Sequence, residues 1–338
     1  MIDLLVAGAG PAGCATAIRA ALAGLSVVVV EPRSGPIDKA CGEGVAHSAV
    51  SYLERLGVAL EGRPFQGIRY LDAGHRVDAR FRAGPGLGVR RTVLQAALLD
   101  RLAELGVPVR AGRVGAITQN SSSVTAAGLT ARYLAAADGL HSPIRRQLCL
   151  GLERSGEVRR GLRQHFLTSP WTDLVEVYWS SLGEAYVTPV ADDLVGVAIL
   201  TSARGSFDSH LDAFPALRRR LAGAPPASSV MGAGPLRQRV RGRVAGRVML
   251  VGDAAGYVDA LTGEGIAVAL RTSAELVRCV LDDRPDAYDV AWRRVSREAR
   301  LLTASLLWAR NRSLLGPRIV PAAAVLPGVY GAIVNRLA

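Results

Sequence analysis

Hydrophobic and polar positions alternate in a regular order over the first thirty-one residues. Residues 3–7 and 26–30 are short apolar runs of strand length, and residues 14–23 between them have helical spacing. Short apolar runs bounded by glycines are typical of strands that are buried on both faces of a parallel sheet. The pattern therefore predicts a strand–helix–strand unit, the repeating element of α/β folds.

The following residues continue this alternation of apolar runs and amphipathic stretches. The pattern predicts helices over residues 46–56 and 90–105, with Leu94, Leu98 and Leu102 on one helical face. Further elements are expected as strands over 106–110, 129–137 and 246–253, a helix over 266–281, and two hairpins, over 66–82 and 113–126. The first hairpin is expected at the side of the domain that contains these elements.

Between residues 160 and 200 the pattern changes to closely spaced strands. Residues 162–168, 174–179, 184–189 and 194–200 are separated by short polar turns, which predicts an antiparallel sheet. A helix is expected over 207–222, followed by a linker rich in Pro and Ser. The predicted fold is α/β with an inserted antiparallel-sheet domain: a discontinuous first domain (1–160 and 235–285), the inserted domain (161–234), and a C-terminal helical segment (286–338).

The C-terminal segment is apolar, helical in pattern and interrupted by Pro317, Pro321 and Pro327. We favour a packing helix that caps the sheet. A lid, a dimer surface and a peripheral membrane-facing element are the alternatives.

Composition excludes several classes of function. The net charge is +12, but Lys39 is the only lysine among the 41 basic residues. The arginines are scattered without interleaved aromatic residues, so we expect no nucleic-acid partner. The four cysteines are widely separated, which predicts reduced thiols and no metal site. The chain begins with a core strand and lacks an apolar stretch of bilayer length, so we expect a cytoplasmic protein without an integral membrane segment.

The first strand runs directly into the glycine-rich sequence Gly8-Ala9-Gly10-Pro11-Ala12-Gly13, and the second strand ends at Glu31. Gly8 permits a tight turn, Gly10 lets a pyrophosphate approach the backbone, and Gly13 lets helix and strand pack closely. The free N–H groups of the helix N-terminus favour an anion, and Glu31 can accept hydrogen bonds from a ribose hydroxyl. A glycine turn in an unrelated α/β protein is the alternative.

Three polar segments add candidates for the same site. Pro32 and Arg33 follow Glu31, and Arg33 is either a phosphate contact or a surface arginine. Cys41 and Gly42 lie in a glycine-rich segment whose backbone either passes close to a flat ligand or simply starts a helix. Arg90 and Arg91 begin a helix, where a basic pair opposes the helix dipole unless an anion is near, although an exposed pair is the alternative.

Two further strands end in an acidic residue. The strand over 129–137 leads into Asp138-Gly139, and the strand over 246–253 ends in Gly252-Asp253. Carboxyl ends of strands form the ligand-binding crevice of α/β sheets. Thr262 is a plausible N-cap for the next helix, whose first turn contains Gly263, Glu264, Gly265 and Ile266 and offers backbone donors. A second glycine-rich strand-to-helix passage so far from the first predicts a large, extended cofactor.

Taken together, the three sites resemble those of the FAD-dependent group A aromatic monooxygenases and their relatives, the geranylgeranyl reductases. The resemblance covers about residues 1–285. It implies a Rossmann-like FAD-binding domain, with Glu31 at the adenosine ribose, Arg91 near the pyrophosphate and Asp138 holding the pyrophosphate region. It also implies Asp253 on the ribityl chain, and the backbone around Gly263-Glu264-Gly265 facing the flavin ring.

The resemblance implies NADPH or NADH as electron donor and a small aromatic or prenyl substrate. We favour hydroxylation of an aromatic or polyketide-like compound through a flavin C4a-hydroperoxide, over reduction of prenyl double bonds. Tyr186-Val187-Thr188-Pro189 only partly matches a Tyr-x-Trp-x-Phe-Pro strand of the reductases, although the Cys41 and Thr262 segments are similar to theirs. A non-catalytic flavin- or lipid-binding protein is a third hypothesis. We expect a monomer or homodimer, and candidate catalytic side chains are those of Cys41, His47, His165, Tyr178 and Tyr186.

Overall fold

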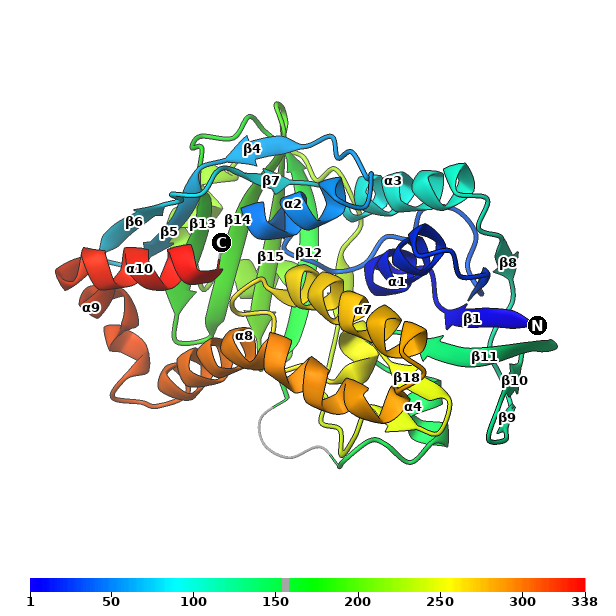
Figure 1. The fold of residues 1–338 in the computed structure, drawn as a ribbon. Coiled ribbons are helices and arrows are strands. Elements are labelled where there is room, and N and C mark those ends of the chain that lie inside the picture. The colour runs from blue at the N-terminus through cyan, green and yellow to red at the C-terminus, as the bar shows by residue number, and fades with distance from the viewer. Residues whose placement is uncertain (154–157, 338) are drawn as a thin grey trace.

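In the computed structural model, which describes residues 1–153 and 158–337, two large sheets stand side by side (Figure 1). The first sheet has eight strands. Its parallel core has the order β18-β11-β1-β2-β8, and β17, β10 and β9 add antiparallel pairs. Its strands are β1 (Ile2–Ala7), β2 (Val27–Glu31), β8 (Val109–Ala111), β9 (Ile117–Gln119), β10 (Val124–Ala126), β11 (Leu129–Ala136), β17 (Val244–Ala245) and β18 (Val248–Leu250).

The predicted strand–helix–strand unit is formed, and helices cover this parallel core (Figure 1). The buried face of α3 consists of Leu94, Gln95, Leu98 and Leu102, as the spacing predicts. The core of this half is made mainly of Val, Leu and Ala side chains from the strands and from α1 and α7. Its helices are α1 (Pro11–Leu22), α2 (His47–Glu54), α3 (Arg91–Glu104), α4 (Pro143–Gln147), η1 (Gly252–Ala255) and α7 (Gly265–Leu281).

The second sheet has seven strands in the order β16-β12-β15-β14-β13-β5-β6. The four strands predicted between residues 160 and 200 are all present and pair antiparallel, with β15 between β12 and β14. A small three-stranded sheet lies beside it: β3 (Gly44–Val45), β4 (Arg63–Phe65) and β7 (Gly86–Gly88). The large sheet consists of β5 (Gly67–Leu71), β6 (Arg76–Arg80), β12 (Arg160–Leu167), β13 (Val175–Ser180), β14 (Gly183–Ala191), β15 (Leu194–Thr201) and β16 (Met231–Ala233).

The hairpin of β5 and β6 is formed, but its predicted location is wrong. β5 pairs in parallel with β13, so the hairpin completes the edge of the seven-stranded sheet. Ile68 lies opposite Val175 and Tyr70 opposite Val177. The hairpin therefore extends the sheet of the inserted domain. The domain boundaries proposed from the sequence stay a prediction.

The single helix expected over 207–222 is also wrong, because the chain forms two short helices, α5 (Phe207–Leu211) and α6 (Pro215–Arg220). Pro215 begins the second helix, and Phe214 before it has φ −129° and ψ 70°, outside the helical region. A residue that precedes proline is pushed out of the α region by the proline ring. Both helices pack on the seven-stranded sheet through Phe207, Leu211 and Leu217.

The C-terminal segment is helical, as predicted, and consists of η2 (Pro285–Ala287), α8 (Tyr288–Arg310), η3 (Gly316–Arg318), α9 (Ile319–Val325) and α10 (Pro327–Leu337). Tyr330 and Val334 of α10 pack against Val77 and Ala79 of β6. The preferred interpretation of a helix that caps the sheet is therefore supported for α10.

Candidate functional site

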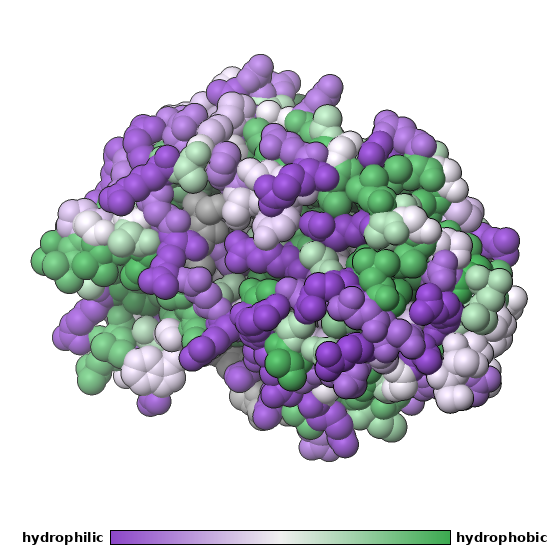
Figure 2. Space-filling model, viewed as in Figure 1, coloured by the Kyte–Doolittle hydropathy of each residue, from purple (hydrophilic) through white to green (hydrophobic). Residues whose placement is uncertain are grey.

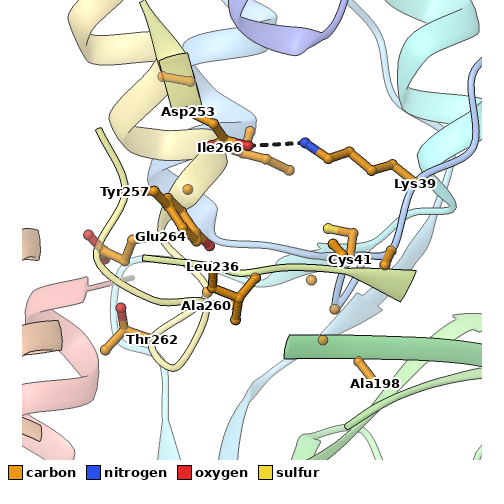
Figure 3. A pocket seen from close by; sticks show the side chains of 18 of the residues that line it. Lys39, Cys41, Ala198, Leu236, Asp253, Tyr257, Ala260, Thr262, Glu264 and Ile266 are labelled. Atoms are coloured by element: carbon orange, nitrogen blue, oxygen red, sulfur yellow. Dashed lines mark hydrogen bonds and ion pairs between the residues drawn. The ribbon is translucent and has the colours of Figure 1, made fainter. Parts of the chain in front are cut away.

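A cavity of about 970 Å³ extends between the two sheets. One end is formed by the loops that follow β1, β2, β11 and β18, and the other by the seven-stranded sheet and the C-terminal helices. Parallel strands bring their carboxyl ends to one edge, which is why motifs far apart in the sequence meet here. Figure 3 shows side chains from several of these segments around the cavity.

Every predicted cofactor-binding residue except Gly13 lines this cavity. The lining includes the glycine-rich turn, the segment around Glu31 and the Cys41 segment, together with Arg91, Asp138 and Asp253. The predicted residues on its wall are Gly8, Gly10, Pro11, Ala12, Glu31, Pro32, Arg33, Cys41, Gly42, Arg91, Asp138, Gly139, Gly252, Asp253, Gly263, Glu264, Gly265 and Ile266. Of the basic pair that begins α3, Arg91 lies on the cavity wall.

The glycine-rich turn has the geometry that its sequence predicts. Gly8 has φ +105°, and its N–H donates to the carbonyl of Val30 at 2.8 Å. A Cβ atom on Gly13 would lie 1.9 Å from the carbonyl oxygen of Gly8, so α1 can approach β1 only with glycine there. A Cβ on Gly10 would meet nothing within 4 Å, because this residue faces the open cavity. Gly13 therefore serves packing, and Gly10 leaves room for a ligand.

Glu31 ends β2 on the cavity wall and is 4% exposed. Its Oε2 accepts a hydrogen bond from the N–H of Ala9 at 2.8 Å, and its Oε1 accepts one from Nε of Arg33 at 2.8 Å. Burial alone would raise the pKa of Glu31, but these hydrogen bonds outweigh it and hold the pKa below its usual value. The carboxylate is therefore ionised and held at the position where a ribose hydroxyl is expected.

Asp138 and Arg91 present buried polar atoms to the cavity. Oδ2 of Asp138 accepts from the N–H of Ile144 at 3.0 Å, whereas Oδ1 has no hydrogen-bond partner among the described residues. Nε of Arg91 is likewise buried and unpaired within the described chain. Burial raises the pKa of Asp138 above its usual value. Buried polar atoms without partners are rare in folded proteins and indicate a missing ligand or water.

Arg145 of α4 joins two of the loops that form the site. Its Nη1 donates to the carbonyl of Ala254 at 3.0 Å, and its Nη2 donates to the carbonyl of Leu140 at 2.8 Å. Burial lowers the pKa of Arg145, which is 5% exposed. The guanidinium thereby fixes the loop after β11 relative to the loop after β18. Sequence reasoning missed this function, because nothing in the local pattern distinguishes Arg145 from Arg146.

The segment before β3 is anchored by an ion pair and by hydrogen bonds. Nζ of Lys39 lies 3.0 Å from Oδ2 of Asp253 (Figure 3). Glu43 has φ +59° and is buried, with its Oε2 2.6 Å from Nε2 of the fully buried His165. Oε1 of Glu43 accepts from the N–H of Arg91 at 3.1 Å. These contacts hold the Cys41 segment against both sheets.

The beginning of α7 differs from the prediction in one respect. Thr262 is not the N-cap: Glu264 occupies that position, without a side-chain capping bond, and Oγ1 of Thr262 pairs with Oγ1 of Thr303 at 2.6 Å. Gly263 has φ +72°. Gly265 and Ile266 still line the cavity. The first N–H groups of a helix have no partner within the helix, so those of α7 are candidate donors to a ligand oxygen.

Glu264 is 8% exposed and points away from Cys41 (Figure 3). It also lines a second cavity of about 50 Å³, together with Trp292 and Thr303. Its Oε1 has no partner within the described residues, and burial raises its pKa to about 7. Its carboxyl group therefore changes charge near neutral pH.

The candidate catalytic side chains are not equally placed. Cys41 and Tyr186 line the cavity, whereas His47, His165 and Tyr178 do not. The hydroxyl of Tyr186 donates to the carbonyl of Leu261 at 2.7 Å, and burial raises its pKa. The hydroxyl of Tyr178 donates to Oε2 of Glu176 at 2.6 Å, and burial raises its pKa too. Cys41 is half-buried, and among the described residues its Sγ accepts a hydrogen bond only from the N–H of Glu43, at 3.4 Å.

Away from this polar end, the cavity wall is apolar. It includes the aromatic rings of Phe65, Tyr70 and Phe81 from the strands around β5 and β6. Sequence reasoning did not assign these residues, or the C-terminal helices, to the site. The spacing of Leu326, Val329, Tyr330 and Ile333 contains the only local clue, a helical apolar face. The other apolar wall residues include Ile68, Leu162, Val175, Val177, Leu200, Leu236, Leu302, Leu306, Ile319, Leu326, Val329, Tyr330, Ile333 and Val334.

The residues present fit FAD. The glycine-rich turn offers an open backbone and a helix N-terminus for a pyrophosphate, and Glu31 stands beside it for a ribose. Asp138 and Arg91 have unpaired buried atoms on the same wall. The fold and the site therefore define a flavin-dependent oxidoreductase of the dinucleotide-binding type.

Comparisons with known proteins agree. Residues 1–182 match the FAD binding domain family. The chain is 31% identical to the menaquinone reductase of Mycolicibacterium smegmatis, over 93% of this chain and 87% of that protein. It is 25% identical to digeranylgeranylglycerophospholipid reductase 2 of Methanosphaera stadtmanae, over 80% and 75% of the two chains. The crystal structure of p-nitrophenol 4-monooxygenase from Pseudomonas putida superposes with a TM-score of 0.82 at 19% identity, over 99% and 98% of the chains.

The chain belongs to the FAD-binding family of flavin-dependent oxidoreductases that includes monooxygenases and reductases. The expected FAD-binding fold is confirmed.

Proposed function

We propose that the protein reduces isolated carbon–carbon double bonds in the isoprenoid chain of a lipid, with FAD as cofactor and NADPH or NADH as electron donor. The observation that carries this proposal is the shape and polarity of the cavity. Its polar end lies at the FAD-binding loops, and the rest continues between apolar side chains to the C-terminal helices. Transfer of an extended hydrocarbon chain from water into such a site is favourable by about 0.8 kcal/mol for each buried CH₂ group.

Saturation of a double bond requires a hydride at one carbon and a proton at the other. FAD, when bound and reduced, supplies the hydride. Cys41 lies on the cavity wall, and its thiol would donate a proton to the second carbon. Water would return a proton to the resulting thiolate. The apolar wall would hold the alkene in place and exclude water.

The relatives support this choice of substrate class. Menaquinone and digeranylgeranylglycerophospholipid, the compounds in the names of two relatives, are both lipids with isoprenoid chains. The sequence alone favoured hydroxylation of a phenol, which would require a base beside the substrate. Tyr186 has its hydroxyl engaged, and His165 and Tyr178 lie outside the cavity. The placement of these side chains therefore shifts the balance toward reduction.

Oxygen-dependent hydroxylation of an aromatic compound is the second candidate. The observation in its favour is the group of rings on the cavity wall, in which Tyr70 lies 4.7 Å from Tyr330 and Phe65 lies 5.6 Å from Phe81 between ring centroids. Such rings could stack on a planar substrate. We also retain from the sequence the proposals of a cytoplasmic location and a monomer or homodimer.

The two candidates can be distinguished with the FAD-loaded protein. Reduced without oxygen and mixed with menaquinone or a geranylgeranyl lipid, wild type should reoxidise its flavin and yield a product two hydrogens heavier by mass spectrometry. The menaquinone product is exposed to air before the mass is measured, so that a quinol returns to the quinone and only reduction of a carbon–carbon double bond is counted. Cys41→Ser should lose at least about 100-fold of this rate, within the range of general acid–base catalysis. Cys149→Ser, at an exposed cysteine, is the matched control. No reduction of either lipid, together with oxygen-dependent hydroxylation of resorcinol- or naphthol-like phenols, would replace the first candidate with the second.

A further inference from the structure

Exposed hydrophobic side chains gather at the C-terminal end of the chain. Most lie on or between α8, α9 and α10, and Figure 2 shows them as a green area at the left, where α9 and α10 lie in Figure 1. Monomeric proteins rarely expose large contiguous apolar patches unless these bind something. We call this set the C-terminal apolar surface: Trp308, Leu314, Val325, Leu326, Val329 and Ile333, which are 44–78% exposed.

The orientation of α10 is fixed by its other face. Tyr330 and Val334 are buried against β6, and the hydroxyl of Tyr330 donates to the carbonyl of Ile68 at 3.2 Å. Asn335 also binds this edge of the sheet, because its Nδ2 donates to the carbonyl of Arg80 at 3.0 Å. These contacts prevent α10 from rotating about its axis, so Val329 and Ile333 stay exposed.

Positive charges predominate around this surface, although Arg336 pairs with Glu298 of α8 and Arg310 pairs with Glu184. Residues 299–338 contain five arginines and no aspartate or glutamate. Arg312 and Arg318 are exposed, and the Arg312 guanidinium lies 5.1 Å from the ring centre of Trp308. Apolar side chains flanked by arginines are typical of segments that lie in the interface of an anionic bilayer.

The cavity reaches the molecular surface at the same place. Leu326, Val329 and Ile333 line the cavity and are also 55%, 54% and 44% exposed. A molecule that leaves the cavity past these side chains would thus emerge within the C-terminal apolar surface. An apolar molecule would be poorly solvated there unless a lipid phase were present.

The geometry fits a helix pair that lies in the interface. Within residues 1–153 and 158–337, no single helix is long and apolar enough to cross a bilayer. The segments Gly316–Val325 and Pro327–Arg336 reach that length and composition only together, and they meet at 105°. With α10 packed on β6, the pair presents one apolar side to the surroundings.

We propose that the C-terminal apolar surface docks on an anionic lipid bilayer, with the cavity opening into its acyl region. Docking itself does not depend on the proposed reaction. Only the further step, the entry of a lipid substrate by this route, rests on the proposed function. The charge, the exposed apolar residues and the cavity opening all coincide at α9 and α10. A second copy of the chain is the competing occupant.

Co-sedimentation of the full-length, FAD-loaded protein with vesicles tests the proposal, without substrate or reductant. Wild type should bind phosphatidylcholine vesicles that contain phosphatidylglycerol, and binding should weaken as salt is added. Leu314→Asp/Val325→Asp, at positions outside the cavity wall, should lower the affinity at least about tenfold, because two buried apolar side chains are lost. Leu22→Asp/Val290→Asp, which alters exposed positions on α1 and at the start of α8, should bind as wild type does.

Tryptophan emission gives an independent reading. Vesicles should shift the emission of wild type to the blue, and Trp308→Phe should remove that shift while the protein still sediments with the vesicles. Absence of wild-type binding, equal binding with and without phosphatidylglycerol, or equal loss in both double variants would overturn the proposal. So would a dimer in solution that Leu314→Asp/Val325→Asp dissociates. Vesicle binding is measured without turnover. A negative result would therefore not bear on the proposed reduction, which the Cys41→Ser variant tests separately.

Discussion

Lys39 and Asp253 are separated by 214 residues in sequence, yet Nζ of one lies 3.0 Å from Oδ2 of the other. The pair bridges the segment after β2 and the loop after β18 across one end of the cavity. Both side chains are partly exposed, at 39% and 29%, so their mutual attraction adds little to stability. Both side chains line the cavity wall, so a molecule bound at this end would lie beside them.

Removal of the Asp253 carboxylate should weaken FAD binding. If this carboxylate accepts a hydrogen bond from the ribityl chain, Asp253→Ala loses a charged hydrogen bond of about 1.5–3 kcal/mol, or about 10- to 100-fold in Kd. Lys39→Met removes only the exposed partner and should change the Kd by less than about fivefold. Titration of the apoprotein with FAD, followed by flavin fluorescence, measures both. FAD binding by Asp253→Ala as tight as that of wild type would contradict the site proposed here.

Alanine substitutions in the glycine-rich turn should separate packing from binding. Gly13→Ala places a Cβ 1.9 Å from the Gly8 carbonyl oxygen and should lower the Tm of the protein even without FAD. Gly10→Ala meets no neighbour within 4 Å and should leave the Tm of the apoprotein unchanged. It should still reduce FAD affinity, since its methyl group enters the cavity beside the helix N-terminus. Equal effects of the two variants on apoprotein stability would refute this distinction.

The sequence was most informative where local pattern and strand order decide the structure. The turn from Gly8 to Gly13 is encoded by adjacent residues, and Glu31, Asp138 and Asp253 all follow strands of one parallel sheet. Their convergence could therefore be predicted without coordinates. Pro215 is an equally local indication that residues 207–222 form two helices, because the amphipathic pattern alone does not show where a helix breaks.

Contacts between distant segments could not be predicted in the same way. β5 pairs with β13 through backbone hydrogen bonds. These bonds do not depend on side-chain identity, so neither sequence indicates the pairing. Thr262 has the residue type of an N-cap, yet its hydroxyl pairs with Thr303 of α8. The buried pair of Glu43 and His165 joins the Cys41 segment to β12, and only the fold brings the two together.

Loss of the Glu43–His165 contact should destabilise the protein and disturb the Cys41 segment. Glu43→Ala leaves His165 and the backbone N–H of Arg91 without their partner, which costs about 1–3 kcal/mol for each buried group. Urea unfolding measures this loss, with Glu54→Ala at an exposed position of α2 as control. The double variant with His165→Ala should be less destabilised than the two single variants combined. Full additivity would show that the two side chains do not interact.

Glu264 should make stability depend on pH. Burial raises its pKa in the folded protein to about 7, from an ordinary value of 4.5. The folded state therefore holds this proton more tightly, so the stabilising contribution is complete below pH 4.5 and is lost as the pH rises through 7. The full loss is on the order of 3 kcal/mol.

The comparison that isolates this effect is the difference between wild type and Glu264→Gln. The free energy of unfolding of the variant should increase relative to that of wild type as the pH rises from 5 to 8, because glutamine stays neutral. Glu54→Gln, at an exposed position, should show no such trend. A difference between wild type and Glu264→Gln that stays constant with pH would rule out the titration of Glu264 in this range.

The single lysine also provides a unique site for chemical labelling. Apart from the α-amino group, Lys39 provides the only primary amine in the chain, and that amine is partly exposed on the cavity wall. An amine-reactive reagent should therefore modify one internal position, and a molecule seated against Asp253 should shield it. Peptide mass mapping of Lys39 labelling would then report occupancy of the site directly, without a spectroscopic property of the ligand or any turnover.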